Sequence, residues 1–385
     1  VGSSGSPKVS YSISIPDGSA ARGIGRSWQT AWGPFEVAPM SSDAESPTGT
    51  FGQVNSDVGT FRVHAPGRVN LIGDHTDYTG GLAFPMAIDR GITLTAQPSA
   101  GQIELTSADE PGLLTLALPF EGDPSGVRPA WGSFVASMAQ QLGASDGFSG
   151  TLESDIPAGA GLSSSAALEC AIGRGLGFDG SPLELAQTAR RAEHAATGVP
   201  TGIMDQYCIA AATAGHATLI DCGELTIEHV PVPDEIDVVV RFIAHRTLLG
   251  SAYADRVAEC ARAEAVIGPL SGATLDDIAH IDDPLVRARA RHVISENQRV
   301  RDFATALPAG DYTTLGNLMT AGHTSLRDDF ATSTAQMDAA VDELNQRRGV
   351  FGARMTGGGF GGCLVALCEP GVISYGWVVR PSAGA

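Results

Sequence analysis

The stretch SDIPAGAGLSSSAALECA, residues 154–171, has the residue types of a loop that holds phosphate. It places Gly159 and Gly161 before three serines and an apolar run with helical character. It has neither the Gly-Lys-Ser/Thr of a P-loop nor the third glycine of a dinucleotide fingerprint, and it contains no Lys or Arg. A helix N-terminus carries free N–H groups and about half a positive charge, so this turn can hold an anion without a basic side chain. The alternative is an ordinary helix capped by serine after a glycine turn.

The composition of the 385 residues is that of a globular protein, with 43% hydrophobic and 17% charged residues. The length is typical of two domains of about 150–200 residues. The formal net charge of −19, without a basic patch, argues against nucleic acid and anionic membranes as partners. The six cysteines show no metal-ligand spacing, which favours buried free thiols in a reducing compartment. There is no signal-peptide pattern and no apolar run near the roughly 20 residues of a membrane span, so we expect a soluble, cytoplasmic protein.

Strand and helix patterns are grouped along the chain rather than alternating, which favours an α+β fold over a doubly wound sheet. Residues 1–55, rich in Ser, Gly and Pro, are interpreted as a poorly ordered tail. Ser181 and Glu184 form the capping box of a helix that ends near Gly198. We place a domain boundary near residue 235. Short strands are expected at 60–65, 91–97, 102–107, 113–118, 148–155, 216–221, 225–232, 236–244, 350–356 and 363–368, and later helices at 252–267, 283–306, 311–326 and 334–348.

A second stretch, APGRVNLIGDHTDYTGGLAFPMAI at 65–88, packs five polar residues between an apolar run and two glycines. Alternating donors and acceptors on one tight loop are what a polyhydroxylated ligand requires. A solvated turn is an equal alternative, as is a two-carboxylate metal site with His75.

A third stretch, GARMTGGGFGGCLVAL at 352–367, matches the dinucleotide fingerprint letter for letter at Gly357, Gly359 and Gly362. A strand-like run follows the glycines, whereas the fingerprint requires a helix. We therefore interpret it as a connection between strands that lets backbone approach a ligand closely, with a purely structural hairpin as the alternative.

Two acids fall in the segment RRAEHAATGVPTGIMDQYCIAAA, residues 190–212. Asp205 lies among apolar residues, and a buried carboxylate requires a partner. Glu193 lies twelve residues earlier, and a pair with Arg190 one helical turn away is its simplest explanation.

Together these segments closely resemble the galactokinase family of GHMP small-molecule kinases. GRVNLIGDHTDY is similar to the family's sugar signature, PAGAGLSSSAAL to its phosphate loop and GARMTGGGFGGC to its third motif. The likeness runs from about residue 61 to 368 in the family's order, with GIMDQ, GSAYADR and HTSLRDDF between the motifs. It implies a two-domain GHMP kinase fold of the α+β class. The N-terminal domain (56–235) would be ribosomal protein S5 domain 2-like and the C-terminal domain (236–385) ferredoxin-like, with the active site in the cleft between them.

The resemblance also implies an activity: ATP-dependent phosphorylation of the C1 hydroxyl of galactose, with Mg²⁺. Asp205 would take the proton from that hydroxyl, and Arg68 beside it would lower the Asp205 pKa and stabilise negative charge. Ser165 and Glu193 would hold Mg²⁺. The sugar would meet Asp74, His75, Thr76, Asp77, Gly202 and Tyr253. Backbone amides of the phosphate loop would surround ATP, namely those of Gly159, Ala160, Gly161, Leu162, Ser163, Ser164 and Ser165.

Two of the departures from the family's pattern bear on substrate and activity. Asp74 stands where the family usually has Glu, which leaves open an N-acetylated, C4-epimeric or pentose substrate. After Cys368 the chain looks short, so the C-terminal domain and its activity are expected to suffer. A non-catalytic sensor of galactose and ATP is the alternative from another class, although Asp205 and Arg68 are both present. We expect a monomer, with a dimer as the alternative.

Overall fold

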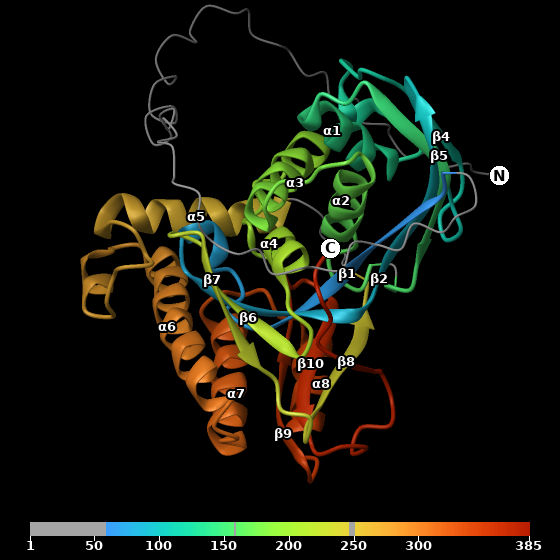
Figure 1. Ribbon diagram of the computed structural model, residues 1–385. Coiled ribbons are helices and arrows are strands. Elements are labelled where there is room, and N and C mark those ends of the chain that lie inside the picture. Colours follow the sequence, from blue (N-terminus) through green and yellow to red (C-terminus); the bar gives the residue numbers. More distant parts are fainter. Residues whose placement is uncertain (1–58, 158, 246–250) are drawn as a thin grey trace, which may run out of the picture. The chain divides into compact units, whose positions relative to one another are not determined.

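A long strand, β2 (Leu82–Ala100), organises the larger of two sheets (Figure 1). It pairs with three strands, and the order across the sheet is β4-β3-β5-β2-β6-β7 with β1 also on β2. All pairings are antiparallel except that of β3 with β5. The other strands are β1 (Phe61–Ile72), β3 (Gln102–Ser107), β4 (Leu113–Ala117), β5 (Asp146–Ser154), β6 (His216–Asp221) and β7 (Thr226–Pro231).

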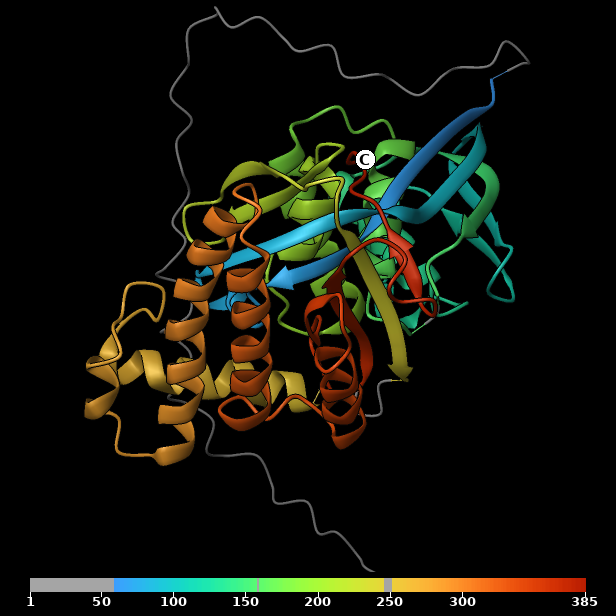
Figure 2. The same ribbon diagram turned by 90° about the horizontal axis from the view of Figure 1, so that it is seen from below.

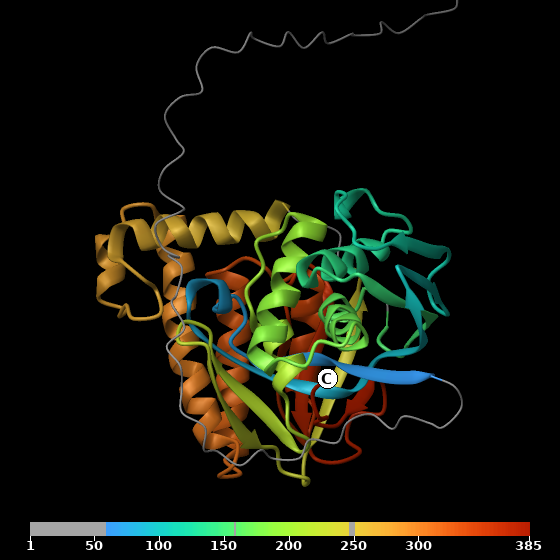
Figure 3. The same cartoon turned by 45° about the horizontal axis from the view of Figure 1, so that its top comes forward.

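Four helices pack together on this sheet, as Figure 3 shows with α2 seen near end-on. They are α1 (Gly132–Leu142), α2 (Ser164–Gly175), α3 (Pro182–Thr197) and α4 (Met204–Ala211). Helices α2 and α4 contact β1 and β2 directly. The predicted capping box is confirmed, because Ser181 accepts from the Glu184 amide while the Glu184 carboxylate accepts from the Ser181 amide.

The smaller sheet, ordered β11-β8-β10-β9, has a hydrophobic cluster on each face. Alternate residues of a strand point to opposite faces. Val238 and Val240 accordingly join the core of the larger sheet, while Val239 joins a second cluster with Met337 and Val341 of α8. The strands are β8 (Asp237–Ala244), β9 (Val350–Met355), β10 (Gly362–Cys368) and β11 (Trp377–Val379).

Helices α6 and α7 lie side by side, and α5 packs on α6 (Figures 1 and 2). Helix α6 also contacts β2, and α7 contacts β9, so this helical pair touches both sheets. The bounds are α5 (Ser251–Ile267), α6 (Pro284–Ala306), α7 (Tyr312–Asp328) and α8 (Ala335–Asn345), and the short 3-10 helices are η1 (Asp77–Thr79), η2 (Pro124–Gly126) and η3 (Asp277–His280).

Two predicted strands were too short. The sequence indicated 60–65 and 91–97, whereas β1 continues to Ile72 and β2 begins at Leu82. The missed halves are buried on both faces, and a strand covered on both sides loses the alternation of polar and apolar residues that marks it.

The structure, a computed structural model, describes residues 59–157, 159–245 and 251–385, which all belong to one compact unit of residues 52–385. The predicted tail at 1–55 lies outside the described residues, and the boundary near 235 stays a prediction. The α+β prediction is confirmed by the grouped helices and largely antiparallel sheets. All six cysteines are buried thiols, as expected. Within the described ranges, no helix combines the length and hydrophobicity of a membrane-spanning segment.

Candidate active site

Three segments that the sequence singled out line one cavity of about 450 Å³. They are the serine turn (residues 159–165), the acidic loop (residues 73–81) and the glycine hairpin (residues 357–362). Arg68, Glu193, Gly202, Asp205 and Tyr253, predicted separately, line the same cavity. The fold thus gathers nearly every candidate residue in one place.

The serine turn leads directly into α2, as the sequence predicted. Gly159 and Gly161 have positive φ angles of 70° and 75°, and Ser163 shares the left-handed conformation at 61°. Helix α2 begins at Ser164, so the first amide groups of the helix have no intrahelical partners. Ala160 and Leu162 have buried side chains and do not line the cavity, which corrects the expectation that they contact the nucleotide. The Ala160 amide donates to the Pro157 carbonyl and the Leu162 carbonyl accepts from the Arg68 amide, so both residues shape the turn. The turn has the features of an anion site without a basic residue.

Arg68 and Asp205 form a bidentate ion pair that contacts the serine turn. Arg68 Nε donates to Asp205 Oδ1 and Nη2 to Oδ2, each at 2.7 Å. Arg68 Nη1 donates to the Gly161 carbonyl at 2.8 Å, and the Ser163 hydroxyl donates to Asp205 Oδ2. The Arg68 side chain is 5% exposed and that of Asp205 31%. The carboxylate is therefore oriented by protein groups and still accessible from the cavity.

Glu193 is held by three side chains, and none of them is Arg190. Its Oε1 accepts from the Ser165 hydroxyl at 3.0 Å, while Oε2 accepts from Thr201 and Gln206, each at 2.8 Å. Arg190 donates instead to the Thr201 carbonyl, so the simple helical pair expected from the sequence is wrong.

Behind Glu193, Gln206 also donates to Glu169, a fully buried acid. Burial, with the nearby charge of Glu193, raises the Glu169 pKa well above its usual value. Sequence reasoning missed both residues as parts of the site. Gln206 in the run QYC and Glu169 in the run LEC have the neighbours of ordinary helix-interior residues. No local sequence signal marks either one as part of a site.

Ser165 and Glu193 fit a magnesium ion. A hydroxyl and a carboxylate oxygen 3.0 Å apart, at the edge of an anion site, are hard oxygen ligands of the kind Mg²⁺ prefers. Mg²⁺ commonly binds through one or two protein groups and completes its shell with phosphate oxygens and water. Thr201 and Gln206 occupy Oε2 and so orient Oε1 toward Ser165.

The acidic loop is buried rather than solvated, so the solvated-turn alternative is wrong. His75 has a left-handed φ of 64°, its Nδ1 lies 3.1 Å from the Tyr78 hydroxyl, and its ring lies 5.5 Å from that of Tyr253. Asp77 lies so close to Gly202 that a Cβ there would meet Asp77 Oδ2 at 1.9 Å. Desolvation, with the charge of Asp205, raises the Asp77 pKa to about 6.

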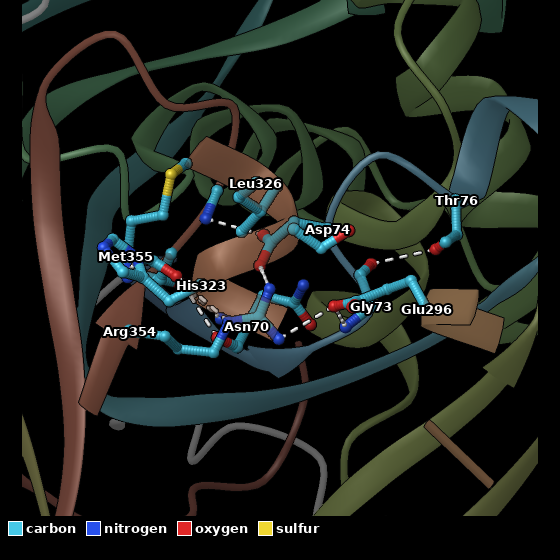
Figure 4. Close-up of polar contacts among 12 residues, drawn as sticks. Asn70, Gly73, Asp74, Thr76, Glu296, His323, Leu326, Arg354 and Met355 are labelled. Carbon is cyan, nitrogen blue, oxygen red and sulfur yellow. Dashed lines mark hydrogen bonds and ion pairs between the residues drawn. The ribbon is translucent and has the colours of Figure 1, made fainter. Parts of the chain in front are cut away.

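Asp74, which lines the cavity, and Thr76, which does not, both hydrogen-bond to other parts of the protein (Figure 4). Asp74 Oδ2 accepts from Arg354 at 2.7 Å, and Oδ1 accepts from the Gly357 amide at 2.7 Å. Burial raises the Asp74 pKa to about 6 against the opposing charge of Arg354. The Thr76 hydroxyl lies between the Gly73 and Leu82 carbonyls and outside the cavity lining. We correct the expectation for Thr76, whose side chain fixes the loop.

The glycine hairpin joins β9 to β10, which pair antiparallel. This confirms that the residues around Gly357 connect two strands and that the dinucleotide fingerprint is coincidental. Gly357, Gly358, Gly359 and Phe360 line the cavity. A Cβ on Gly359 would meet the Thr332 carbonyl at 2.5 Å, so glycine is required there for packing as well as for its φ of 74°.

Three family models match the chain in the order expected for one enzyme family. The galactokinase galactose-binding signature matches residues 50–98, the GHMP kinase N-terminal domain residues 131–215 and the GHMP kinase C-terminal domain residues 303–372. The acidic loop, the serine turn and the glycine hairpin each fall in one of these three matches.

Relatives match over most of their own length. The galactokinase of Chloroflexus aurantiacus is 42% identical over 331 residues, covering 79% of this chain and 82% of that protein. The galactokinase of Bos taurus is 40% identical over 326 residues, covering 80% and 83%. The crystal structure of Lactococcus lactis galactokinase complexed with galactose superposes with a TM-score of 0.78 at 31% identity, covering 84% of this chain and 94% of that one.

Proposed function

Since the chain belongs to the galactokinase family of GHMP kinases, we propose that it transfers the γ-phosphoryl group of ATP to the C1 hydroxyl of galactose. The observation that carries this proposal is the Arg68–Asp205 pair, whose accessible carboxylate opens into the cavity shared by the serine turn and the acidic loop.

Asp205 is the general base in this proposal. Arg68 donates one hydrogen bond to each Asp205 carboxylate oxygen, and Ser163 donates one to Oδ2. An ionised carboxylate has about four acceptor positions, so not all of them are used. The remaining positions accept the proton of the sugar hydroxyl as its oxygen attacks phosphorus. Arg68 keeps its positive charge throughout and offsets the negative charge that develops beside it.

The serine turn binds the phosphates of ATP through backbone amides and the N-terminus of α2. Ser165 and Glu193 hold Mg²⁺, which neutralises phosphate charge when bound. Phosphoryl transfer requires mainly alignment and charge stabilisation, and these groups supply both without a lysine.

The sugar occupies the side of the cavity formed by His75, Asp77, Gly202 and Tyr253. Carboxylate and imidazole groups beside aromatic rings suit a ligand with hydroxyls on one face and C–H groups on the other. With the side chain of Asp74 engaged by Arg354, we assign the direct polar contacts to His75 and Asp77.

The proposal is tested by ADP release with ATP, Mg²⁺ and a panel of galactose, N-acetylgalactosamine, glucose and arabinose. We expect galactose to give the highest kcat/KM. A higher value with another sugar would place the protein among related sugar kinases. Galactose binding without ADP release would identify a sensor and overturn the enzymatic proposal.

A further inference from the structure

Arg354 of β9 is completely buried behind the acidic loop and bridges two carboxylates (Figure 4). Its Nη2 donates to Asp74 Oδ2 at 2.7 Å and its Nη1 to Glu296 Oε1 at 2.8 Å. Both acids are also buried, with 1% and 0% of their side chains exposed. Neither Arg354 nor Glu296 lines the cavity, so neither can touch a ligand there.

Glu296 of α6, which Arg354 links to Asp74, also binds the acidic loop directly. Its Oε1 also accepts from the Gly73 amide at 3.0 Å, and its Oε2 accepts from Arg299 at 2.6 Å. Two guanidinium groups thus balance two carboxylates. Such balance is what allows buried charges to persist, and removing one member leaves the others uncompensated.

The same network reaches the glycine hairpin. Asp74 Oδ1 accepts from the Gly357 amide, and the adjacent Thr356 hydroxyl bonds both the amide and the carbonyl of Asn70. The acidic loop is therefore tied at Gly73 and Asp74 to residues that lie more than two hundred positions away. The acidic loop and the glycine hairpin, which both line the cavity, are therefore held by the same buried network.

The loop needs such support, because His75 adopts a left-handed φ of 64°, which a residue with a Cβ holds only when its surroundings impose it. The two positions that immediately precede His75 are those bound by Glu296 and Arg354. Loss of this anchoring would let His75 and Asp77 move while leaving the serine turn in place.

We propose that Arg354 and Glu296 are positioning residues for the sugar: through Gly73 and Asp74 they fix the acidic loop, and they contribute to galactose recognition without contacting it. The inference rests on the proposed function, since it takes the acidic loop as the sugar-binding wall.

The test compares KM for galactose with KM for ATP in two variants. Arg354→Lys keeps the charge but cannot bridge both acids, and Glu296→Gln keeps the shape of the side chain but removes its charge. We expect KM for galactose to rise about ten- to a hundredfold, as for small displacements of positioned groups, with KM for ATP within about twofold. Asn345→Ala is the control, because Asn345 accepts from the Ala353 amide on the same strand without reaching the loop. It should lower Tm and leave both KM values unchanged.

Calorimetric titration of galactose into each folded variant, without ATP, separates this inference from the proposed function. Weaker binding in both variants supports the inference. Wild-type binding and KM in either folded variant overturn it. Should one variant fail to fold, the other decides. A wild-type protein that phosphorylates no sugar contradicts the proposed function instead.

Discussion

Two sides of the cavity place their charged side chains in different environments. The serine-turn wall is the serine turn with Asp205 and Glu193, and the acidic-loop wall is the acidic loop with Arg354 and Glu296 behind it. On the serine-turn wall, Asp205 and Glu193 come from elements close in the chain to the turn, and the Asp205 carboxylate is 31% exposed. On the acidic-loop wall, Asp74 and its partners Arg354 and Glu296 are fully buried, and two of the three come from the far end of the chain.

This difference distinguishes charges that meet a ligand from charges that shape a site. The accessible Asp205 carboxylate can meet a ligand, and its neutralisation leaves Arg68 without its ion-pair partner. The buried carboxylates of Asp74 and Glu296 balance Arg354 and Arg299, and neutralising either acid leaves a guanidinium uncompensated. Substitutions on the serine-turn wall should therefore act on chemistry, and those on the other wall on sugar affinity and stability.

The largest effect is expected for Asp205→Asn. The amide cannot accept the hydroxyl proton, so kcat should fall by about 10²- to 10⁴-fold, while the dissociation constant for galactose changes only a few-fold. ADP release and calorimetry measure the two quantities. Asp302→Asn, on the exposed face of α6, is the matched control. Full activity in Asp205→Asn would remove this residue from the mechanism.

Glu193→Ala tests the metal side of the same wall. The variant should need about ten- to a hundredfold more Mg²⁺ for half-maximal activity, by analogy with losses seen when a metal site is disturbed. Titrating Mg²⁺ at saturating ATP and galactose gives this number. Glu184→Ala, at the exposed start of the same helix, removes a cap and should leave the Mg²⁺ requirement unchanged. An unchanged requirement in Glu193→Ala would count against the assignment.

Gly202→Ala tests the sugar contact of Asp77 on the acidic-loop wall. Its new Cβ would lie 1.9 Å from Asp77 Oδ2, so the Asp77 carboxylate must shift. We expect KM for galactose to rise about tenfold with a smaller change in kcat. Gly272→Ala is the control, because no atom lies within 4 Å of a Cβ there. Equal KM values for the two variants would show that Asp77 does not contact the sugar.

The smallest effect is the pH dependence of the acidic loop. The pKa of Asp77 is raised to about 6 in the folded protein, so kcat/KM for galactose should fall by about twofold at pH 6 and about tenfold at pH 5.

Stability should follow the opposite trend. Between the unfolded pKa of 3.8 and the folded value of about 6, only the folded protein keeps this proton. The contribution of Asp77 to stability is therefore greatest below about pH 4 and is lost as pH rises to 6. Thermal unfolding of wild type and Asp77→Asn between pH 4 and 7 measures this difference. A wild-type advantage that grows with pH would contradict the shift.

Much of the serine-turn wall was predictable from local patterns. Glycines before serines and an apolar run predicted the turn and the start of α2, and Ser181 with Glu184 predicted the start of α3. The roles of Asp205 and Glu193 came from family resemblance, since spacing alone favoured an Arg190 pair that the structure lacks.

By itself, then, the sequence determined the turns, the caps and the order of the motifs, because these depend on interactions over a few residues. Only the tertiary structure decided that the Asp74 carboxylate, at the cavity lining, accepts from Arg354 and the Gly357 amide. It alone decided that β1 continues to Ile72 and that burial raises the Glu169 pKa. Burial and charge pairing depend on which distant segments meet, and no short window of residues records that.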